Sequence, residues 1–420
     1  MLRGGGTWTP RPRLGYVAAG AGSDESVSRT ELSTMREGSF DALSWPLEAE
    51  QFTDRVDAKE LGALMYDNLP VIDCHGHMST PPEFRAYAMN LQSNRSPRNA
   101  PLRIDENRLK LSTNRHIQML DERNIDVQMI SPRPVAMMHY ERPFIVHNWT
   151  TTTNNVIKEL CDALPDRFVG IAQLPQNSEQ DTSHCIKEFE RSINELGFVG
   201  ALVNPDPGAD RQYPGMNEEY WFPLYEASES LDAPLIVHPS VSKDPRLDII
   251  LSSYQYNNLT EEVLAILLLR HSDVFERFPR LRVIVCHCGG ALDRFIPNAP
   301  SSGQAGGGQA ISAQAAPAEQ SHDDVRDLSN NLFIDSCAYD PNFLSAAIKQ
   351  WGVNQVIFGT EAPGSGTSDL NVETDRPSDD LIPVFEHFDF LTNEDRRKIL
   401  HDNAIRVFPR LTSTAALAGR

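Results

Sequence analysis

The sequence predicts an α/β protein built on one closed (β/α)8 barrel, or TIM barrel, with an N-terminal extension. Three observations lead to this fold. Eight short apolar runs recur along the 420 residues, helical patterns separate them, and the runs end in polar, glycine or proline residues. Continuous apolar strands that alternate with helices are typical of a parallel sheet buried on both faces. Eight such units in about 340 residues fit a closed barrel.

The predicted strands follow one another at intervals that leave room for a helix after each. Their ranges are Leu69–His77, Asp126–Pro134, Val169–Pro175, Gly200–Pro207, Pro234–Ser240, Arg282–Gly290, Asn331–Tyr339 and Gln355–Pro363. Helical patterns lie over Glu48–Asp67, Glu261–Phe278 and Asn342–Gly352. An open doubly wound sheet is the alternative, but the Gly-x-Gly-x-x-Gly turn typical of that fold does not follow the first strand.

Composition divides the chain into a leader, a barrel and a short tail. Residues 1–47 are rich in Gly, Pro, Ser and Thr, so we expect a disordered or loosely attached leader. The barrel is expected over residues 48–410. Gly, Ala, Ser and Gln dominate residues 298–320, which predicts a flexible insertion there. Residues 411–420 would form a tail.

The charge and the cysteine content exclude several classes of protein. The chain has 38 Lys and Arg against 58 Asp and Glu, a formal charge of −20, which argues against a nucleic-acid partner. Its apolar runs are too short to cross a membrane, and the N-terminus lacks the apolar stretch of a secretory signal. The six cysteines follow the spacing of neither a disulfide scaffold nor a pair of zinc knuckles. We therefore expect a cytoplasmic protein without nucleic-acid or membrane partners.

Histidines and one acid stand at the ends of four predicted strands. His75 and His77 end the first strand, His238 the fifth, His287 the sixth, and Glu361 the eighth. Barrel enzymes carry their catalytic groups at the carboxyl ends of the strands, and alternate residues of an extended chain point the same way. Imidazole and carboxylate groups suit a divalent ion such as Zn²⁺. The sequence therefore predicts a metal site at the mouth of the barrel.

These strand ends resemble the amidohydrolase superfamily, and within it the branch that holds aminocarboxymuconate-semialdehyde decarboxylase. The likeness covers roughly residues 69–410. Most of that branch has Asp on the last strand, whereas this chain has Glu361 followed by Ala-Pro-Gly, which is similar to the 4-oxalomesaconate hydratases. The segments 73–77 (DCHGH), 130–134 (ISPRP), 204–207 (NPDP) and 287–290 (HCGG) agree with that group. Two departures are Cys288, where Gly is usual, and Pro239-Ser240, where Ala-Thr is usual.

The resemblance implies a role for each residue. One divalent metal ion, Zn²⁺ or alternatively Mn²⁺, would bind to His75, His77, His238 and Glu361. His287 and Glu361 would form the catalytic pair, with His287 moving a proton, although His287 as a metal ligand is the competing interpretation. Substrate contacts would come from Arg133, Ser131, Asn204 and Tyr254.

Each of these substrate contacts has a plainer alternative. Arg133 suits a bidentate grip on a carboxylate, but a surface ion pair is the alternative. Asn204 before a proline is also typical of a turn, and Tyr256 is as plausible a phenol as Tyr254. Asp335, at the end of the seventh strand, would orient a histidine or cap the following loop.

The expected function is that of a metal-dependent hydro-lyase that adds water to a 4-oxalomesaconate-like unsaturated polycarboxylate in aromatic-acid catabolism. The alternative is a metal-dependent, non-oxidative decarboxylase of a hydroxylated aromatic or muconate-type acid. A hydrolase of a C–C or C–N bond, and a barrel that only binds a ligand, are further hypotheses. The expected partner is a small anionic carboxylate, and a homodimer is possible.

Overall fold

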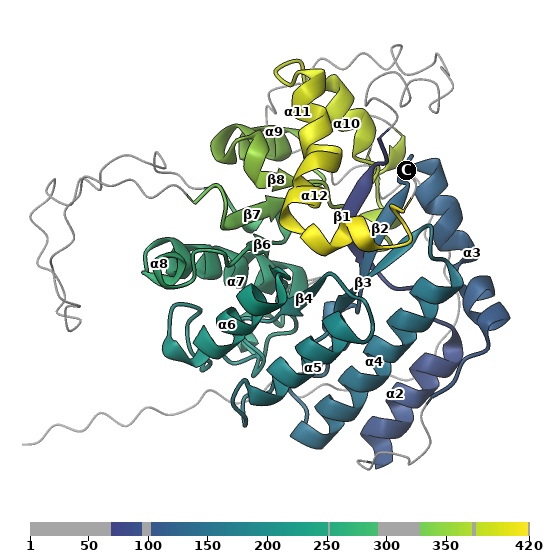
Figure 1. Cartoon of the computed structure of the whole chain (residues 1–420), viewed down its shortest axis with the longest axis vertical. Coiled ribbons are helices and arrows are strands. Elements are labelled where there is room, and N and C mark those ends of the chain that lie inside the picture. The colour runs from purple at the N-terminus through teal and green to yellow at the C-terminus, as the bar shows by residue number, and fades with distance from the viewer. Residues whose placement is uncertain (1–68, 95–101, 251–252, 293–327, 372–374, 419–420) are drawn as a thin grey trace, which may run out of the picture. The chain divides into compact units, whose positions relative to one another are not determined.

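The computed structural model describes residues 69–94, 102–250, 253–292, 328–371 and 375–418. Within them, eight strands form one sheet in sequence order, and all the pairings in it are parallel (Figure 1). The strands are β1 (Ile72–His77), β2 (Val127–Ser131), β3 (Phe168–Ala172), β4 (Gly200–Val203), β5 (Leu235–Val237), β6 (Val283–Val285), β7 (Leu332–Asp335) and β8 (Val356–Ile357).

Backbone hydrogen bonds close this sheet into a barrel. The N–H of Cys74 donates to the carbonyl of Phe358 (2.8 Å), and the N–H of Glu361 donates to that of His75 (2.6 Å). These bonds join β1 to the chain that leaves β8, which confirms the predicted (β/α)8 barrel. The strands are shorter than predicted. From β2 to β8 the last residues of the predicted ranges leave the ladder, whereas β1 is shorter only at its amino end and keeps His75 and His77 in the strand.

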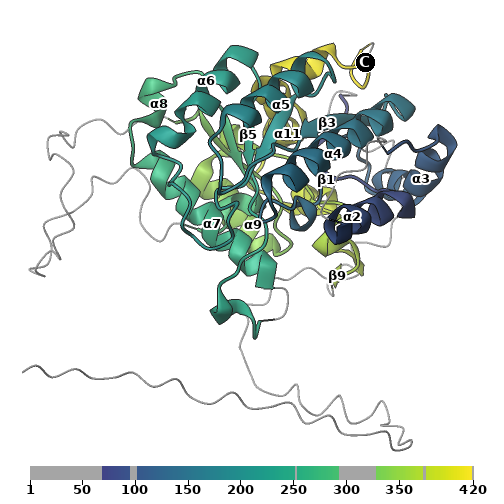
Figure 2. The same ribbon diagram turned by 90° about the horizontal axis from the view of Figure 1, so that it is seen from below.

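Helices surround the barrel (Figures 1 and 2). They are α2 (Pro82–Asn94), α3 (Glu106–Glu122), α4 (Pro143–Ala163), α5 (Ser183–Asn194), α6 (Phe222–Leu231), α7 (Ser253–Arg270), α8 (Val274–Arg277), α9 (Pro341–Trp351), α10 (Ile382–His387), α11 (Asn393–Arg397) and α12 (Asn403–Val407). A short antiparallel pair, β9 (Leu370–Asn371) with β10 (Arg376–Pro377), follows β8.

Two of the predicted helices can be compared with these elements. The pattern over 342–352 corresponds to α9. The single helix expected over 261–278 is wrong, because the structure has two helices, α7 and α8, with a break between Arg270 and Val274. Ser272 and Asp273 occupy the break, and such residues favour helix caps over helix interiors. The helix expected over 48–67 lies outside the described residues, as do the leader 1–47 and the insertion 298–320.

Apolar side chains pack in two layers because residues alternate along each strand. On β5, Leu235 and Val237 face the helices, while Ile236 belongs to the cluster inside the barrel. Leu411 and Ala416 belong to the same inner cluster and are 0% and 1% exposed. The tail expected over 411–420 is therefore packed in its described part, since these apolar side chains are buried against the barrel.

Candidate metal centre

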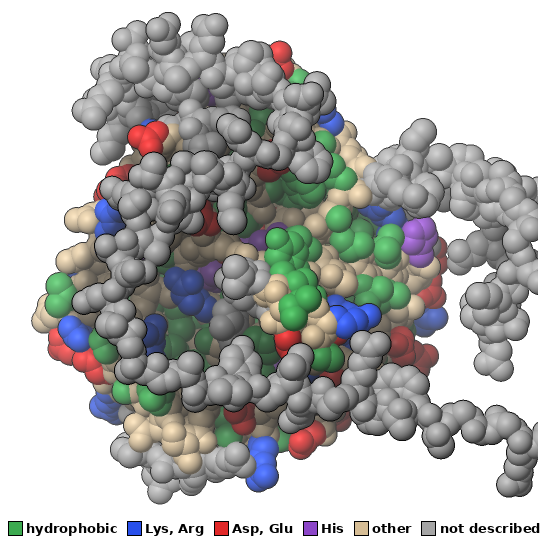
Figure 3. All heavy atoms as spheres, turned by 180° about the vertical axis from the view of Figure 1, so that it is seen from behind, with side chains coloured by type: hydrophobic (Ala, Val, Ile, Leu, Met, Phe, Trp, Pro, Cys, Tyr) green, Lys and Arg blue, Asp and Glu red, His purple; other side chains and the backbone are tan. Residues whose placement is uncertain are grey.

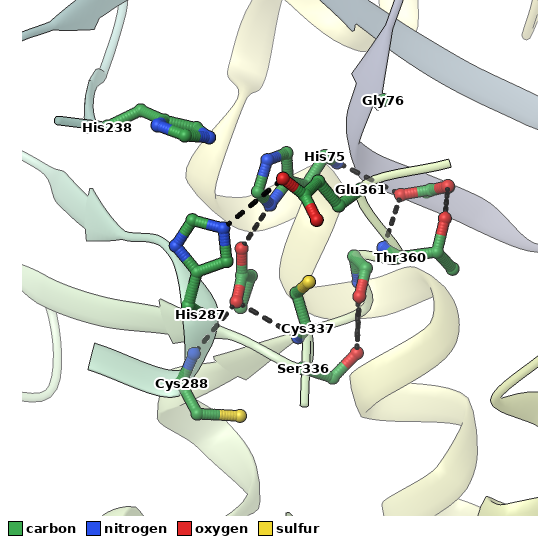
Figure 4. Close-up of polar contacts among 12 residues, drawn as sticks. His75, Gly76, His238, His287, Cys288, Ser336, Cys337, Thr360 and Glu361 are labelled. Atoms are coloured by element: carbon green, nitrogen blue, oxygen red, sulfur yellow. Dashed lines mark hydrogen bonds and ion pairs between the residues drawn. The ribbon is translucent and has the colours of Figure 1, made fainter. Parts of the chain in front are cut away.

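Four side chains from the carboxyl ends of three strands converge at the mouth of the barrel. His75, His77, His238 and Glu361 each bring one possible ligand atom, and these atoms all lie within 4.8 Å of one another. The ring centroids of His75 and His238 are 5.0 Å apart, and Figure 4 shows both side chains beside Glu361. The structure thus brings together the four residues that the family resemblance implies as metal ligands.

The three histidines of this set present unpartnered nitrogens to one another. The Nε2 atoms of His75, His77 and His238 are buried and have no hydrogen-bond partner among the described residues. A buried polar atom left without a partner costs about 1–3 kcal/mol. Burial also lowers the pKa of His77 to about 4 and that of His238 well below its usual value. Neutral imidazoles with free Nε2 lone pairs fit a bound cation.

The other nitrogen of each ring is held in place. The Nδ1 of His75 lies 2.7 Å from Asp335 Oδ2, and the Nδ1 of His77 lies 3.1 Å from Ser131 Oγ. The Nδ1 of His238 lies 2.9 Å from the carbonyl of the next residue, Pro239. A partner on Nδ1 fixes the tautomer and the ring orientation that direct Nε2 at a metal ion.

A buried carboxylate ties the first strand to the last one. Asp73 accepts hydrogen bonds from the N–H of His75 (2.9 Å), the hydroxyl of Thr360 (2.6 Å) and the amide of Gln128 (2.8 Å). Burial raises the pKa of Asp73 to about 6. The β1–β2 register shifts between Asp73 and Gly76, and a Cβ at Gly76 would lie 2.1 Å from Gln128 Cδ. A larger residue there would displace the buried Gln128 side chain, and the irregularity lies where β1 carries its histidines.

Glu361 is held so that one carboxylate oxygen faces the histidines. Its φ is 62°, a left-handed conformation that is uncommon outside glycine and concentrates at functional sites. Tyr339 and Ser365 donate their hydroxyls to Oε2 at 3.0 and 2.6 Å. Oε1 lies 3.6 Å from His287 Nε2 and 3.9 Å from His77 Nε2. Burial raises the pKa of Glu361, but the two histidines outweigh it and hold the pKa well below its usual range.

His287 stands between two carboxylates. Its Nδ1 lies 2.6 Å from Glu262 Oε1 on α7. Burial lowers the pKa of His287, but Glu262 and Glu361 outweigh it, so the pKa lies well above its usual value. His287 and Cys288 have left-handed φ values of 49° and 56°. A Cβ at Gly290 would lie 2.4 Å from the carbonyl oxygen of Leu259, so this turn can pack against α7 only with glycine there.

A pocket opens over this cluster and encloses about 520 Å³, including part of the open solvent at its mouth. Its lining combines metal-site histidines with one arginine, several small polar residues and two prolines: His77, Arg133, Pro134, His238, Pro239, Ser240, Asn258, Glu361, Gly364 and Ser365. Figure 3 looks onto a hollow in which His and Lys or Arg side chains are visible. Arg133 is exposed and gives this lining a cation.

The other sequence-predicted substrate residues lie elsewhere. Ser131 contacts His77, as described above, and does not line the pocket. Asn204 is buried and donates its amide to His139 Nδ1 (3.2 Å), and it also lies outside the pocket lining. The sequence suggests neither the Ser131–His77 contact nor the Asn204–His139 contact, because each joins segments far apart in the chain. Tyr254 lies on α7, and its side chain is outside the described residues.

Sequence reasoning missed Glu262, Tyr339 and Ser365. A signal for Glu262 was present, because two adjacent acids interrupt an otherwise apolar helical segment. Tyr339 and Ser365 lie in the loops after β7 and β8, where a motif gives no indication of side-chain direction. Asp335 contacts His75, which agrees with the expectation that Asp335 orients a histidine.

The chain is similar to proteins of known activity over most of its barrel. The amidohydrolase family model matches residues 72–410. A 2-keto-4-carboxy-3-hexenedioate hydratase of Sphingobium sp. is 30% identical, over 83% of this chain and 99% of the relative. A 2-amino-3-carboxymuconate-6-semialdehyde decarboxylase of Dictyostelium discoideum is 27% identical, over 59% of this chain and 65% of the relative.

A solved structure agrees over nearly the same extent. The 4-oxalomesaconate hydratase of Rhodopseudomonas palustris superposes with a TM-score of 0.67 at 25% identity, and the match covers 83% of this chain and 98% of that one. Hydratases and decarboxylases of these kinds are lyases. The matched family model and these relatives show that the chain belongs to the amidohydrolase family and to its group of lyases.

Proposed function

We propose that this protein is a metal-dependent hydro-lyase that adds water to a small unsaturated polycarboxylate similar to 4-oxalomesaconate. The observation that carries the proposal is the convergence of four ligand atoms within 4.8 Å, next to His287. Two hydratase relatives support the choice of a hydratase, because the matches cover 99% and 98% of the length of those relatives. Such a reaction belongs to the breakdown of aromatic acids.

The donor set fits a divalent metal ion. Three neutral imidazole nitrogens and one carboxylate oxygen would hold it, from His75, His77, His238 and Glu361. This set suits Zn²⁺ first and Mn²⁺ as the alternative. When bound, such an ion lowers the pKa of a water molecule to about 7 at favourable sites and so supplies a nucleophile. The six cysteines are free thiols, which fits the reducing cytoplasm proposed as the location.

Arg133 would bind a carboxylate of the substrate. Its planar guanidinium can donate two parallel hydrogen bonds to a carboxylate. The chain as a whole has a formal charge of −20, so an anionic substrate needs a local reversal of sign. Arg133 in the pocket lining, together with a divalent cation, would provide that reversal.

His287 would supply the proton. Hydration forms a C–O bond at one carbon of the double bond and a C–H bond at the other, and the second carbon needs a proton. Glu262 occupies the Nδ1 of His287, which leaves Nε2 facing the ligand cluster 3.6 Å from Glu361. An imidazole held by carboxylates on both sides keeps a proton available at Nε2.

The second candidate is a decarboxylase of a hydroxylated aromatic or muconate-type acid. The observation in its favour is the decarboxylase relative, 27% identical. The same residues would serve, with His287 protonating the carbon that loses carbon dioxide. The two reactions differ in whether the substrate gains a water molecule or loses a carboxylate.

Paired assays separate these functions. Purified protein loaded with Zn²⁺ or Mn²⁺ is given 4-oxalomesaconate in one series and a panel of hydroxybenzoates in the other. We expect loss of the double-bond absorbance in the first series without carbon dioxide. Carbon dioxide release from the panel, with no reaction of the unsaturated acid, would favour the decarboxylase.

Variants test the assigned roles. His75→Ala and Glu361→Ala each remove a ligand, so we expect both to lose metal and activity. His287→Ala should keep its metal content and lose turnover. The control is Asn258→Ala, a change in the same pocket lining that should leave the metal content unchanged. Loss of metal from His287→Ala would show that His287 is a ligand.

A further inference from the structure

The turn that follows Arg133 is held to the barrel by several hydrogen bonds. It is a short 3-10 helix, η2 (Pro134–Ala136), and the N–H of Ala136 donates to the carbonyl of Arg133 at 2.9 Å. Side chains of three other segments donate to the next carbonyl oxygens: Ser240 to Pro134 (2.6 Å), Trp149 to Ala136 (2.7 Å) and Gln173 to Met137 (2.8 Å). The side chain of Arg133 is exposed, and this turn fixes the backbone from which it extends.

Ser240 is the one of these three donors that lines the pocket. It is 6% exposed and stands two residues after His238, one of the proposed metal ligands. Between them, the carbonyl of Pro239 lies 2.9 Å from His238 Nδ1. Three consecutive residues therefore carry a proposed ligand, the group that orients it and the donor that holds the turn after Arg133.

Ser240 is itself held from the other side by α7. The amide of Asn257, a residue 2% exposed, donates to the carbonyl of Ser240 at 3.2 Å. Arg211 Nη2 in turn donates to Asn257 Oδ1 at 3.3 Å. The segment that carries His238 and Ser240 is thus fixed between α7 and the turn after Arg133.

The bond from Ser240 to Pro134 joins the carboxyl ends of two strands that are not neighbours. In the sheet, β3 and β4 lie between β2 and β5, so the ladder does not place the residues beyond β2 and β5 against one another. The hydroxyl of Ser240 does so directly. A hydroxyl has a single proton, and Ser240 gives it to Pro134, so it donates none to a substrate. Ser240 is therefore placed to act through Arg133.

We propose that Ser240 is a positioning residue that sets the distance between Arg133 and the metal ligands. In the proposed function, on which this role of Ser240 rests, Arg133 binds a carboxylate of the substrate. A polycarboxylate that contacts the metal ion with one group and Arg133 with another binds well only when both ends match that distance. Ser240 would thus select substrates by the spacing of their carboxylates.

Binding of tricarballylate, a saturated tricarboxylate that cannot be hydrated, to the full-length protein loaded with Zn²⁺ tests the proposal by calorimetric titration. Ser240→Ala should weaken this binding about 10-fold, the order expected for one lost buried hydrogen bond. The KM for 4-oxalomesaconate should rise by a similar factor, while kcat and the metal content stay close to those of the wild type. Ser240→Thr keeps the hydroxyl and should restore both the binding and the KM.

A matched control separates positioning from stability. Ser228 is 2% exposed, and its hydroxyl donates to the carbonyl of Ala233 at 2.7 Å, outside the pocket lining. Ser228→Ala should lower the melting temperature about as much as Ser240→Ala and leave tricarballylate binding unchanged. In an Arg133→Ala background, Ser240→Ala should have no further effect, because a positioning residue acts through the residue that it positions.

The outcomes distinguish this role of Ser240 from the proposed function. Unchanged binding in Ser240→Ala, or a 10-fold loss that persists beside Arg133→Ala, would overturn the role of Ser240 alone. An equal loss of binding in Ser228→Ala would do the same. A wild-type protein that does not bind tricarballylate, or an Arg133→Ala variant that binds it as tightly as the wild type, would contradict the proposed function and this role together.

A second variant guards against misfolding of Ser240→Ala. Ser240→Cys keeps the size of the side chain but has a weaker donor, so it should also weaken tricarballylate binding. Wild-type binding in a folded Ser240→Cys variant would overturn the role of the hydroxyl. Metal content and circular dichroism check that each variant is folded.

Discussion

At the scale of single residues, the candidate site depends on side chains that hold the ligand residues in position. Asp335 and Ser131 occupy the Nδ1 atoms of His75 and His77, and Tyr339 occupies one oxygen of Glu361. These partners leave the remaining atoms facing one point. Partners of this kind typically change metal affinity about 10- to 100-fold when removed. The geometry of the site therefore also depends on the residues that hold the far atoms of the ligand side chains.

Glu262→Gln tests how His287 is positioned. The change keeps a hydrogen-bond partner for Nδ1 but removes the negative charge beside it. We expect kcat to fall about 10- to 100-fold, part of the 10²- to 10⁴-fold that a positioned acid or base contributes. The KM and the metal content should stay close to those of the wild type, as measured by steady-state kinetics and elemental analysis.

Glu261→Gln is the matched control for this prediction. It is the preceding acid on the same helix and is bonded to Arg211 instead of His287. Equal losses of kcat in the two variants would mean that both act by destabilising α7, and the positioning role of Glu262 would then be wrong.

Particular residues show what the sequence could and could not reveal about the site. His238 and Glu361 follow from alternation, because Ile236 and Ile357 point into the barrel and every second residue after them shares that side. The position of His75 does not follow from alternation. Ile72 and Cys74 belong to the inner cluster, so strict alternation would point His75 away from the barrel interior, and the irregularity in β1 changes its direction. His287 depends on a left-handed turn that no periodicity indicates.

At the scale of elements, the order and type of the strands were predictable and their limits were not. Apolar runs locate β1 to β8 because both faces of each strand are buried. The ends of the strands depend on which backbone N–H and C=O groups still pair with the neighbouring strand, and the apolar pattern does not show this. Helix α7 also shows what the pattern could not indicate, because Glu261 and Glu262 are buried through contacts with Arg211 and His287, which lie far from them in the sequence.

A buried ion pair joins two elements far apart in the sequence. Arg123, at the end of α3, donates to Asp379 between β10 and α10 at 2.6 and 2.8 Å, and the two side chains are 3% and 0% exposed. Asp379→Ala leaves the guanidinium buried without its partner. We expect the free energy of unfolding to fall by about 3–5 kcal/mol in urea denaturation.

The control for this prediction is an exposed ion pair on the same helix. Asp121 pairs with Arg167 at 2.8 Å, and its side chain is 63% exposed. Asp121→Ala should cost no more than about 1 kcal/mol, because solvent screens the pair. Similar losses from both substitutions would contradict the importance of burial at Asp379.

At the scale of the whole molecule, the barrel sets the positions of the ligands and the metal ion should in turn stabilise the barrel. A ligand that binds the folded state alone stabilises it by about 2.7 kcal/mol at 100 times its dissociation constant. We expect the melting temperature to fall on removal of metal by a chelator and to recover on addition of Zn²⁺ or Mn²⁺. The measurement is differential scanning calorimetry, and His75→Ala should show neither change.

The whole chain also shows which properties its composition determines. None of the helices over the described residues combines the length and the apolar character needed to cross a membrane. The formal charge of −20 describes the surface and says little of the pocket, where Arg133 and the histidines gather. Composition could not reveal that local reversal, because strands distant in the sequence create it by meeting at one end of the barrel.

The central claim is that the site adds water to a carbon–carbon double bond. The most direct measurement is mass spectrometry of the product formed from 4-oxalomesaconate by metal-loaded protein in ¹⁸O-labelled water. We predict a product that has gained one water molecule, carries one solvent-derived oxygen on carbon and retains every carboxylate. A product that has lost a carboxylate as carbon dioxide, or no reaction of this acid beside turnover of a hydroxybenzoate, would contradict the claim.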